Sequence, residues 1–257
     1  MKEIKSILKL YSSLKSSGEK CAIAQVVRVE DSSYRREGAR MLVFESGVFE
    51  GGISGGCLEG DALLRSQIAI LKQQPSIVTY DTSKENEIGV GLGCNGVIDV
   101  LISPIYESSL TLEMLQKCVS DRGVHIIATV TALNSDTPEI TLGKSYYYDK
   151  SSAFLEDCTH DGLRNFLQDK IQEVFENNKS KTYRFEAEGV KASVFIEFIP
   201  PQIHLVIYGD NYDVYPMLDM AKLMDWEVSL VGNVQKLKKE KLRYVKNIFL
   251  KDEIARP

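Results

Sequence analysis

The chain has 257 residues and concentrates its glycines in two short windows. Six of its 18 glycines lie within residues 47–60 and four within residues 89–96. Glycine loses more conformational freedom on folding than any other residue, so such a density is expected where the backbone needs positive φ or where a ligand approaches bare backbone. The two windows therefore predict two loops with an unusual backbone conformation or with a ligand close to the backbone.

Each glycine window also carries one cysteine. The first runs directly into a helix expected from Glu59, so its backbone N–H groups can converge on an anion as helix N-termini do. One interpretation makes both loops tight turns with a small buried cysteine. Two loops of the same chemistry in one domain instead favour a shared binding site. Its candidate residues are Gly55, Gly56, Cys57 and Glu59 in the first loop and Gly91, Gly93, Cys94 and Asn95 in the second.

A third polar segment, Asp31–Arg36, follows the first expected strand. Ser33 and Arg35 are candidates to hold a phosphate, because a hydroxyl and a guanidinium both donate hydrogen bonds to phosphate oxygens. Taken alone, this segment favours a solvated turn.

Hydrophobic periodicity predicts mixed α/β structure with too many hairpins for a purely parallel sheet. The helix expected over 59–72 has Leu63, Leu64, Ile68 and Leu71 at helical spacing, and Pro104 is expected to end a strand over 97–102. Further helices are expected over 1–14, 110–119 and 161–175, and strands over 22–29, 40–44, 48–50, 77–80, 124–133, 182–187 and 191–199.

Pro200-Pro201 is the clearest domain boundary, since a diproline is stiff and lacks two N–H donors. Beyond it, strand 203–208, Gly209, a helix and strand 227–231 resemble the opening of a doubly wound nucleotide-binding unit. We therefore predict an α/β protein with a mixed-sheet domain over 1–199 and an abbreviated Rossmann-like domain over 202–257.

Composition narrows the class of protein. The net charge of −5 offers no broad basic field to nucleic acid, and no apolar run approaches the length of a membrane span. The five cysteines form no CxxC pair, which argues against a disulfide framework or a structural zinc site. These features lead us to expect a cytoplasmic protein with reduced thiols.

Three segments together resemble the XdhC/CoxI family. They are Val27–Met41, Gly52–Asp61 and Gly91–Val100, in the same order as in that family, and Phe195–Pro201 resembles its junction into a Rossmann-like domain. The resemblance implies an accessory protein that binds molybdenum cofactor and delivers it to a molybdenum hydroxylase such as xanthine dehydrogenase. It also implies a cysteine desulfurase as a second partner.

The molybdenum cofactor suits the two loops chemically, because it carries a phosphate, a fused polar ring and a dithiolene. Cys57 and Cys94 are candidate soft ligands or thiol hydrogen-bond donors near the metal, which is a hypothesis from the single cysteine in each loop. An abbreviated doubly wound half with an uncovered edge also predicts a homodimer.

Other functions remain open. A nicotinamide-dependent oxidoreductase would fit the strand–Gly209–helix pattern, but the turn reads Gly209-Asp210-Asn211-Tyr212-Asp213, so its second glycine is missing and carboxylates stand where a pyrophosphate would bind. We therefore do not expect NAD(P) binding. A thiol enzyme with Cys57 as nucleophile and a regulatory or scaffolding relative that carries no cofactor are further alternatives, so whether the chain is an enzyme stays undecided.

Overall fold

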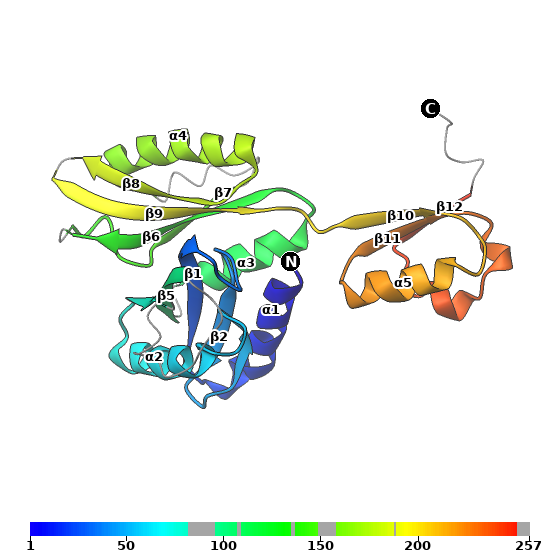
Figure 1. Cartoon of the computed structure of the whole chain (residues 1–257), viewed down its shortest axis with the longest axis horizontal. Coiled ribbons are helices and arrows are strands. Elements are labelled where there is room, and N and C mark those ends of the chain that lie inside the picture. The colour runs from blue at the N-terminus through cyan, green and yellow to red at the C-terminus, as the bar shows by residue number, and fades with distance from the viewer. Residues whose placement is uncertain (82–95, 107–108, 135–136, 149–157, 188, 251–257) are drawn as a thin grey trace. The chain divides into compact units, whose positions relative to one another are not determined.

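A computed structural model describes residues 1–81, 96–106, 109–134, 137–148, 158–187 and 189–250 (Figure 1). The chain divides into two compact units, with the division between Pro200 and Pro201.

The first unit contains two antiparallel sheets. The five-stranded sheet has the order β3-β2-β1-β5-β4 and the four-stranded sheet the order β7-β6-β9-β8. Its strands are β1 (Cys21–Asp31), β2 (Arg40–Phe44), β3 (Phe49–Gly51), β4 (Ser76–Asp81), β5 (Gly96–Ile105), β6 (His125–Leu133), β7 (Ser145–Tyr148), β8 (Lys181–Ala187) and β9 (Val190–Ile199).

Four α-helices cover these sheets: α1 (Lys2–Leu14), α2 (Glu59–Lys72), α3 (Thr111–Ser120) and α4 (Asp161–Asn177). The buried residues of α2 pack on one face of the five-stranded sheet. Those of α1 and α3 fill the space between that sheet and the four-stranded sheet. Helix α4 lies across the outer face of the four-stranded sheet, as Figure 1 shows.

Helix α2 packs on its sheet with small side chains. The buried stripe consists of Ala62, Ser66, Ala69 and Ile70, whereas the large residues Leu64, Ile68 and Leu71 are at least half exposed. The apolar spacing thus predicts the helix correctly but not its buried face. The small residues let the helix lie close to the sheet, and Ile70 with the partly buried Leu63 adds apolar contact beside them.

Strand β5 continues through Pro104, contrary to the expectation that this proline ends it. Pro104 pairs with Ala22 of β1, while on its other side β4 extends only as far as the partner of Ile102. Proline lacks an N–H donor, so it is tolerated where no neighbouring strand needs that donor.

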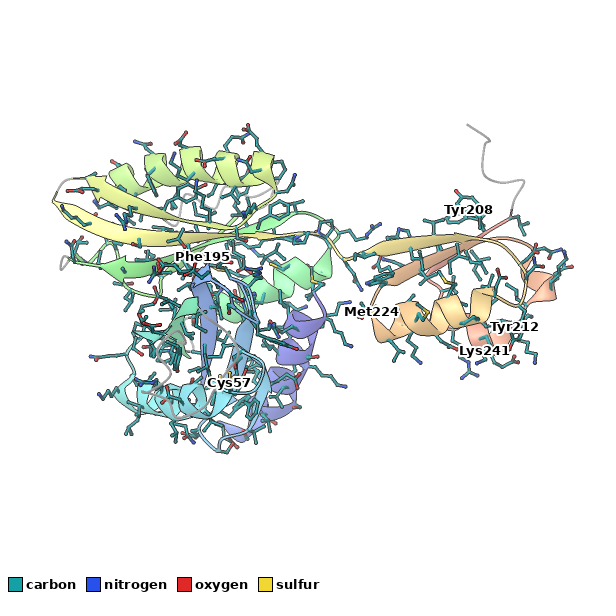
Figure 2. The ribbon with its side chains drawn as sticks, in the orientation of Figure 1. Cys57, Phe195, Tyr208, Tyr212, Met224 and Lys241 are labelled. Carbon is teal, nitrogen blue, oxygen red and sulfur yellow. The ribbon has the colours of Figure 1, made fainter. Side chains whose placement is uncertain are left out.

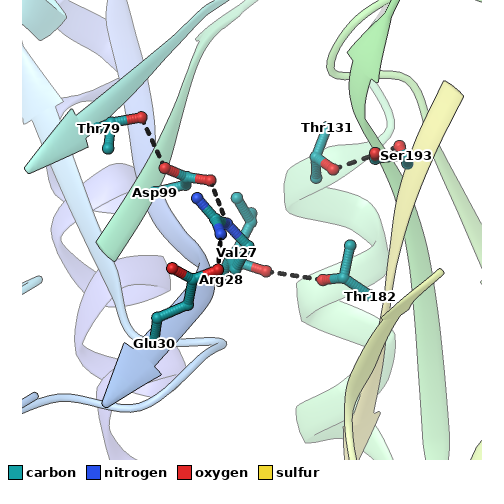
Figure 3. A network of polar contacts seen from close by, with 8 residues as sticks. All are labelled: Val27, Arg28, Glu30, Thr79, Asp99, Thr131, Thr182 and Ser193. Carbon is teal, nitrogen blue, oxygen red and sulfur yellow. Dashed lines mark hydrogen bonds and ion pairs between the residues drawn. The ribbon is translucent and has the colours of Figure 1, made fainter. Parts of the chain in front are cut away.

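The two sheets of the first unit are joined by polar contacts and by side-chain packing. A break in the β1–β5 register at Val27 leaves its carbonyl oxygen free to accept a hydrogen bond from Thr182 Oγ1 of β8 at 3.0 Å (Figure 3). The Val27 side chain packs with Leu101 and with Phe195 of β9. Next to the break, Arg28 Nε donates to Asp99 at 2.6 Å within the first sheet.

A buried ion pair makes a second link between the sheets. Arg40 of β2 and Glu197 of β9 are in direct contact, with side chains only 5% and 7% exposed. Gln25 Nε2 donates to the same carboxylate at 3.0 Å, and Arg40 also donates to the Gly38 carbonyl at 2.8 Å. These contacts fix the chain from residue 38 to β2 relative to the end of β9.

The second unit is a parallel sheet in the order β10-β11-β12, formed by His204–Tyr208, Glu227–Val231 and Asn247–Phe249. Helix α5 (Val214–Leu223) connects β10 to β11 and packs on one face of the sheet. The lysine-rich segment between β11 and β12 has the charge pattern of a solvated helix face but forms short 3-10 turns at Val234–Lys236 and Lys239–Leu242. The mixed α/β class is therefore confirmed, while the Rossmann-like assignment of this unit stays a prediction.

No helix within the described ranges is long and apolar enough to cross a membrane.

Candidate functional site

The first glycine window forms a loop that is held in shape by its own residues. The Glu59 carboxylate, at the start of α2, accepts hydrogen bonds from the N–H groups of Ile53 at 3.1 Å and Ser54 at 2.8 Å, and from Ser54 Oγ at 2.5 Å. Ser54 Oγ in turn accepts from the N–H groups of Gly56 at 3.2 Å and Leu58 at 3.1 Å. Four loop N–H groups are thus occupied inside the loop, which corrects the expectation that they converge on an external anion.

The ionisation of Glu59 reflects this bracing. Burial on its own raises the pKa of the carboxyl group, but the hydrogen bonds from Ser54 and Ile53 outweigh burial and lower the pKa below its ordinary value. A carboxylate at the first residue of a helix is also stabilised by the helix dipole. The carboxylate oxygens of Glu59 therefore stabilise the conformation of the loop. Direct contact of Glu59 with a cofactor stays a prediction.

The outer surface of the loop exposes bare backbone and one thiol. Gly56 has φ +111°, and a Cβ at Gly56 or at Gly60 would point into open space. Cys57, labelled in Figure 2, is exposed, and its Sγ lies 3.5 Å from Ser54 Oγ. The first bond within α2 is donated by Ala62 N, so the N–H group of Gly60 precedes the hydrogen-bonded ladder of the helix.

The predicted Asp31–Arg36 segment lies against this loop. A Cβ on Gly55 would lie 3.2 Å from the ring of Tyr34, so the ring packs directly against this glycine. Gly96, the last glycine of the second window and the part of it that the structure describes, pairs with Asp31, and a Cβ there would clash with the Ser32 carbonyl oxygen. The glycine loop before α2 and the first residue of β5 therefore both contact this turn.

Two predicted residues of that turn have different surroundings. Arg35 forms an ion pair with Glu3 of α1, and Glu3 also accepts a hydrogen bond from Arg40 N at 3.0 Å. Ser33 is half-buried. Sequence reasoning does not select Tyr34, because its contact with Gly55 comes from a loop some distance away in the chain.

The second half of the predicted site cannot be placed in the same way. Gly91, Gly93, Cys94 and Asn95 lie outside the described residues. Within the described ranges, no group of three or more His, Cys, Asp or Glu side chains is arranged to hold a metal ion. The assignment of Cys57 and Cys94 to a metal thus stays a prediction.

The turn after β10 holds a carboxylate at the carboxyl end of the parallel strands. Asp210 is 9% exposed, its Oδ2 accepts from Asn233 N at 3.1 Å, and Lys236 Nζ lies 3.7 Å from its Oδ1. In doubly wound proteins a dinucleotide binds at this edge of the sheet. The Asp210 carboxylate occupies a backbone donor there, which argues against a dinucleotide phosphate at the same place.

The sequence of this region is similar to that of a known protein family. Residues 14–81, which include the 31–36 turn and the loop before α2, match the sequence model of the XdhC and CoxI family. The resemblance to this family is confirmed. The matched segment is the part of the first unit in which the turn and the first glycine loop meet.

Two further proteins resemble the chain over most of its length. A protein of Bacillus subtilis (strain 168), described as a probable subunit of xanthine dehydrogenase, is 27% identical over 215 residues, which are 82% of this chain and 59% of that protein. The crystal structure of a xanthine dehydrogenase from Bacillus halodurans superimposes with a TM-score of 0.63 at 23% identity, covering 95% of this chain and 68% of that one. The chain therefore shares its fold with the Bacillus halodurans protein and spans about 59% of the Bacillus subtilis relative.

Proposed function

We propose that this chain is an accessory protein that binds molybdenum cofactor on the 52–60 loop and the 31–36 turn and delivers it to a molybdenum hydroxylase of the xanthine dehydrogenase type. The observation that carries the proposal is the contact of the 31–36 turn with both the glycine loop before α2 and Gly96, the last glycine of the second window. Gly55 lies against the Tyr34 ring, and a Cβ at Gly96 would clash with the Ser32 carbonyl oxygen. The family match over residues 14–81 supports the same function.

The residues present fit the cofactor. Open space above Gly56 and Gly60 lets a bulky group approach bare backbone, and the Cys57 thiol is exposed beside it. Thiolates suit molybdenum as they suit other soft centres. When bound, the cofactor would supply the redox-active metal for the client enzyme, and this chain's residues would hold and shield it.

An exposed loop also suits transfer rather than turnover. A carrier must release its cargo to a second protein, so a site at the surface of the first unit is easier to unload than an enclosed cavity. The proposal includes a molybdenum hydroxylase as client and a cysteine desulfurase that modifies the bound cofactor. It also includes a homodimer in the cytoplasm, and the free thiols among the described cysteines are compatible with that compartment. It assigns no catalytic residue to this chain.

Cofactor retention tests the proposal. Purified protein is mixed anaerobically with molybdenum cofactor released from a donor enzyme, and the cofactor that co-elutes in gel filtration is measured as its fluorescent oxidised pterin. We expect stoichiometric retention by the wild type and loss in the Cys57→Ala/Cys94→Ala protein. Cys57→Ser is the matched control, since it preserves size and the contact with Ser54 but removes the soft ligand.

The outcomes separate the parts of the proposal. Retention that is unchanged in the double alanine protein removes the thiols from the site and leaves the carrier function. Absence of retention by folded wild-type protein contradicts the carrier function and favours a regulatory relative that binds no cofactor.

A further inference from the structure

A pocket of about 470 Å³ opens next to the loop site, between the 34–38 segment, the start of α1 and the end of β9. Its floor is the buried pair of Arg40 and Glu197, and a Cβ at Gly38, which has φ +90°, would lie 2.6 Å from the Glu197 carboxylate. Glycine at this position therefore lets the 34–38 segment pass directly over the ion pair. The floor is fixed by both sheets, so the pocket is part of the folded unit.

Tyr34 belongs to the pocket and to the loop at once. Its ring lies against Gly55 and lines the pocket, yet the residue is 73% exposed. The side chain of an exposed tyrosine is usually free to rotate. Here the backbone of the glycine loop contacts one part of the Tyr34 ring and holds its orientation. The remaining ring surface is free for a planar ligand, because aromatic rings stack readily on one another.

The pocket wall carries both signs of charge. Arg36 and Glu37 line it, and within the described part of the chain neither side chain has a hydrogen-bond or ion-pair partner. Arg35, by contrast, is already paired with Glu3. A wall with one donor cation and one acceptor anion matches a heteroaromatic ring whose edge contains both acceptors and N–H donors.

We propose that this pocket binds the pterin ring system of the cofactor, stacked on Tyr34, with Arg36 and Glu37 at its polar edge. The proposal rests on the proposed function for the identity of the ligand and on the pocket for its position. It gives the cofactor an orientation, with the ring at the 34–38 segment and the dithiolene end towards Cys57. Tyr34 then acts as a binding residue that determines specificity for a planar ring.

The test uses free 2-amino-4-oxopteridine, a fluorescent pterin without metal, dithiolene or phosphate. Its fluorescence is titrated with wild-type protein and with Tyr34→Ala, Tyr34→Phe and Tyr212→Ala. Tyr212, labelled in Figure 2, is 82% exposed and lies in the second unit, so it is the matched control. We expect Tyr34→Ala to weaken binding about tenfold or more, as loss of one stacking partner does, with Tyr34→Phe and Tyr212→Ala close to wild type.

Three results would overturn the inference. If Tyr34→Ala binds pterin as tightly as the wild type, Tyr34 is not part of the binding site. If the wild-type protein retains the complete cofactor in gel filtration but does not bind pterin, the pocket is not the pterin site, while the carrier function still holds. If the wild type binds neither pterin nor cofactor, both the pocket and the proposed function are wrong. Because Tyr34 is exposed, circular dichroism should show each variant folded.

Discussion

Replacing Glu59 with glutamine tests the bracing of the glycine loop. The carboxylate accepts from Ile53 N, Ser54 N and Ser54 Oγ, and each hydrogen bond to a charged group contributes about 1.5–3 kcal/mol. Glutamine keeps one acceptor oxygen, and water replaces part of the rest because the side chain is half-buried. We therefore expect a loss of about 2 kcal/mol, or a fall in Tm of roughly 4–8 °C for a domain of this size.

The pH dependence of Glu59→Gln follows from the lowered pKa. A carboxyl group whose pKa is lower in the folded state stabilises the fold above its unfolded pKa of about 4.3, and this contribution disappears as the pH falls through the folded pKa. The wild-type protein should thus exceed Glu59→Gln in stability at pH 7, and the difference should begin to narrow once the pH falls below about 4.3.

Urea unfolding at pH 7 and at about pH 3.5, with hydrogen exchange at the Ile53 and Ser54 amides, measures both effects. Asp61→Asn is the control, because Asp61 lies in the same helical turn but is 43% exposed and should cost less than about 1 kcal/mol. Equal stability of Glu59→Gln and wild type at pH 7, with unchanged protection of the two amides, would refute the reasoning.

Three further changes follow from the same structure. Arg40→Met should cost about 3–5 kcal/mol because it leaves the Glu197 carboxylate buried and unpaired, and the double variant Arg40→Met/Glu197→Leu should recover most of that loss in urea unfolding. Gly60→Ala should stabilise α2 by up to about 1 kcal/mol yet reduce cofactor retention in gel filtration, since its methyl group fills the open space above the loop. Iodoacetamide at pH 8 should label native Cys57 and spare Cys118, whose pKa burial raises to about 12, and peptide mass spectrometry reads both; labelling of Cys118 before unfolding would contradict its burial.

Secondary structure can be predicted where the periodicity and the packing agree. Helix α4 has one apolar stripe, and Leu163, Leu167 and Ile171 on it are buried as the pattern indicates. In α2 the pattern and the packing disagree, because Leu64, Ile68 and Leu71 face outward while Ala62, Ser66 and Ala69 approach the sheet. A single sequence does not reveal how closely a helix will approach its neighbours, so it does not identify the buried face.

The site is predictable in part for a similar reason. Glycine density locates the loop before α2, and the resemblance locates the turn that meets it. The brace formed by Ser54 and Glu59 is not evident from the sequence pattern, although a hydroxyl and a carboxylate at the start of a helix are typical capping groups. The contact of Tyr34 with Gly55 depends on how β1 enters its turn, which only the folded chain fixes.

The most direct test of the central claim is a footprint of the cofactor on Cys57. The rate of its alkylation by iodoacetamide is measured by peptide mass spectrometry with and without saturating molybdenum cofactor under anaerobic conditions. If the cofactor lies over the 52–60 loop, the exposed Cys57 thiol should become protected when cofactor is added, while alkylation of the unfolded protein stays unchanged. Cofactor that is retained by the protein while Cys57 reacts at its original rate would show that the cofactor binds elsewhere.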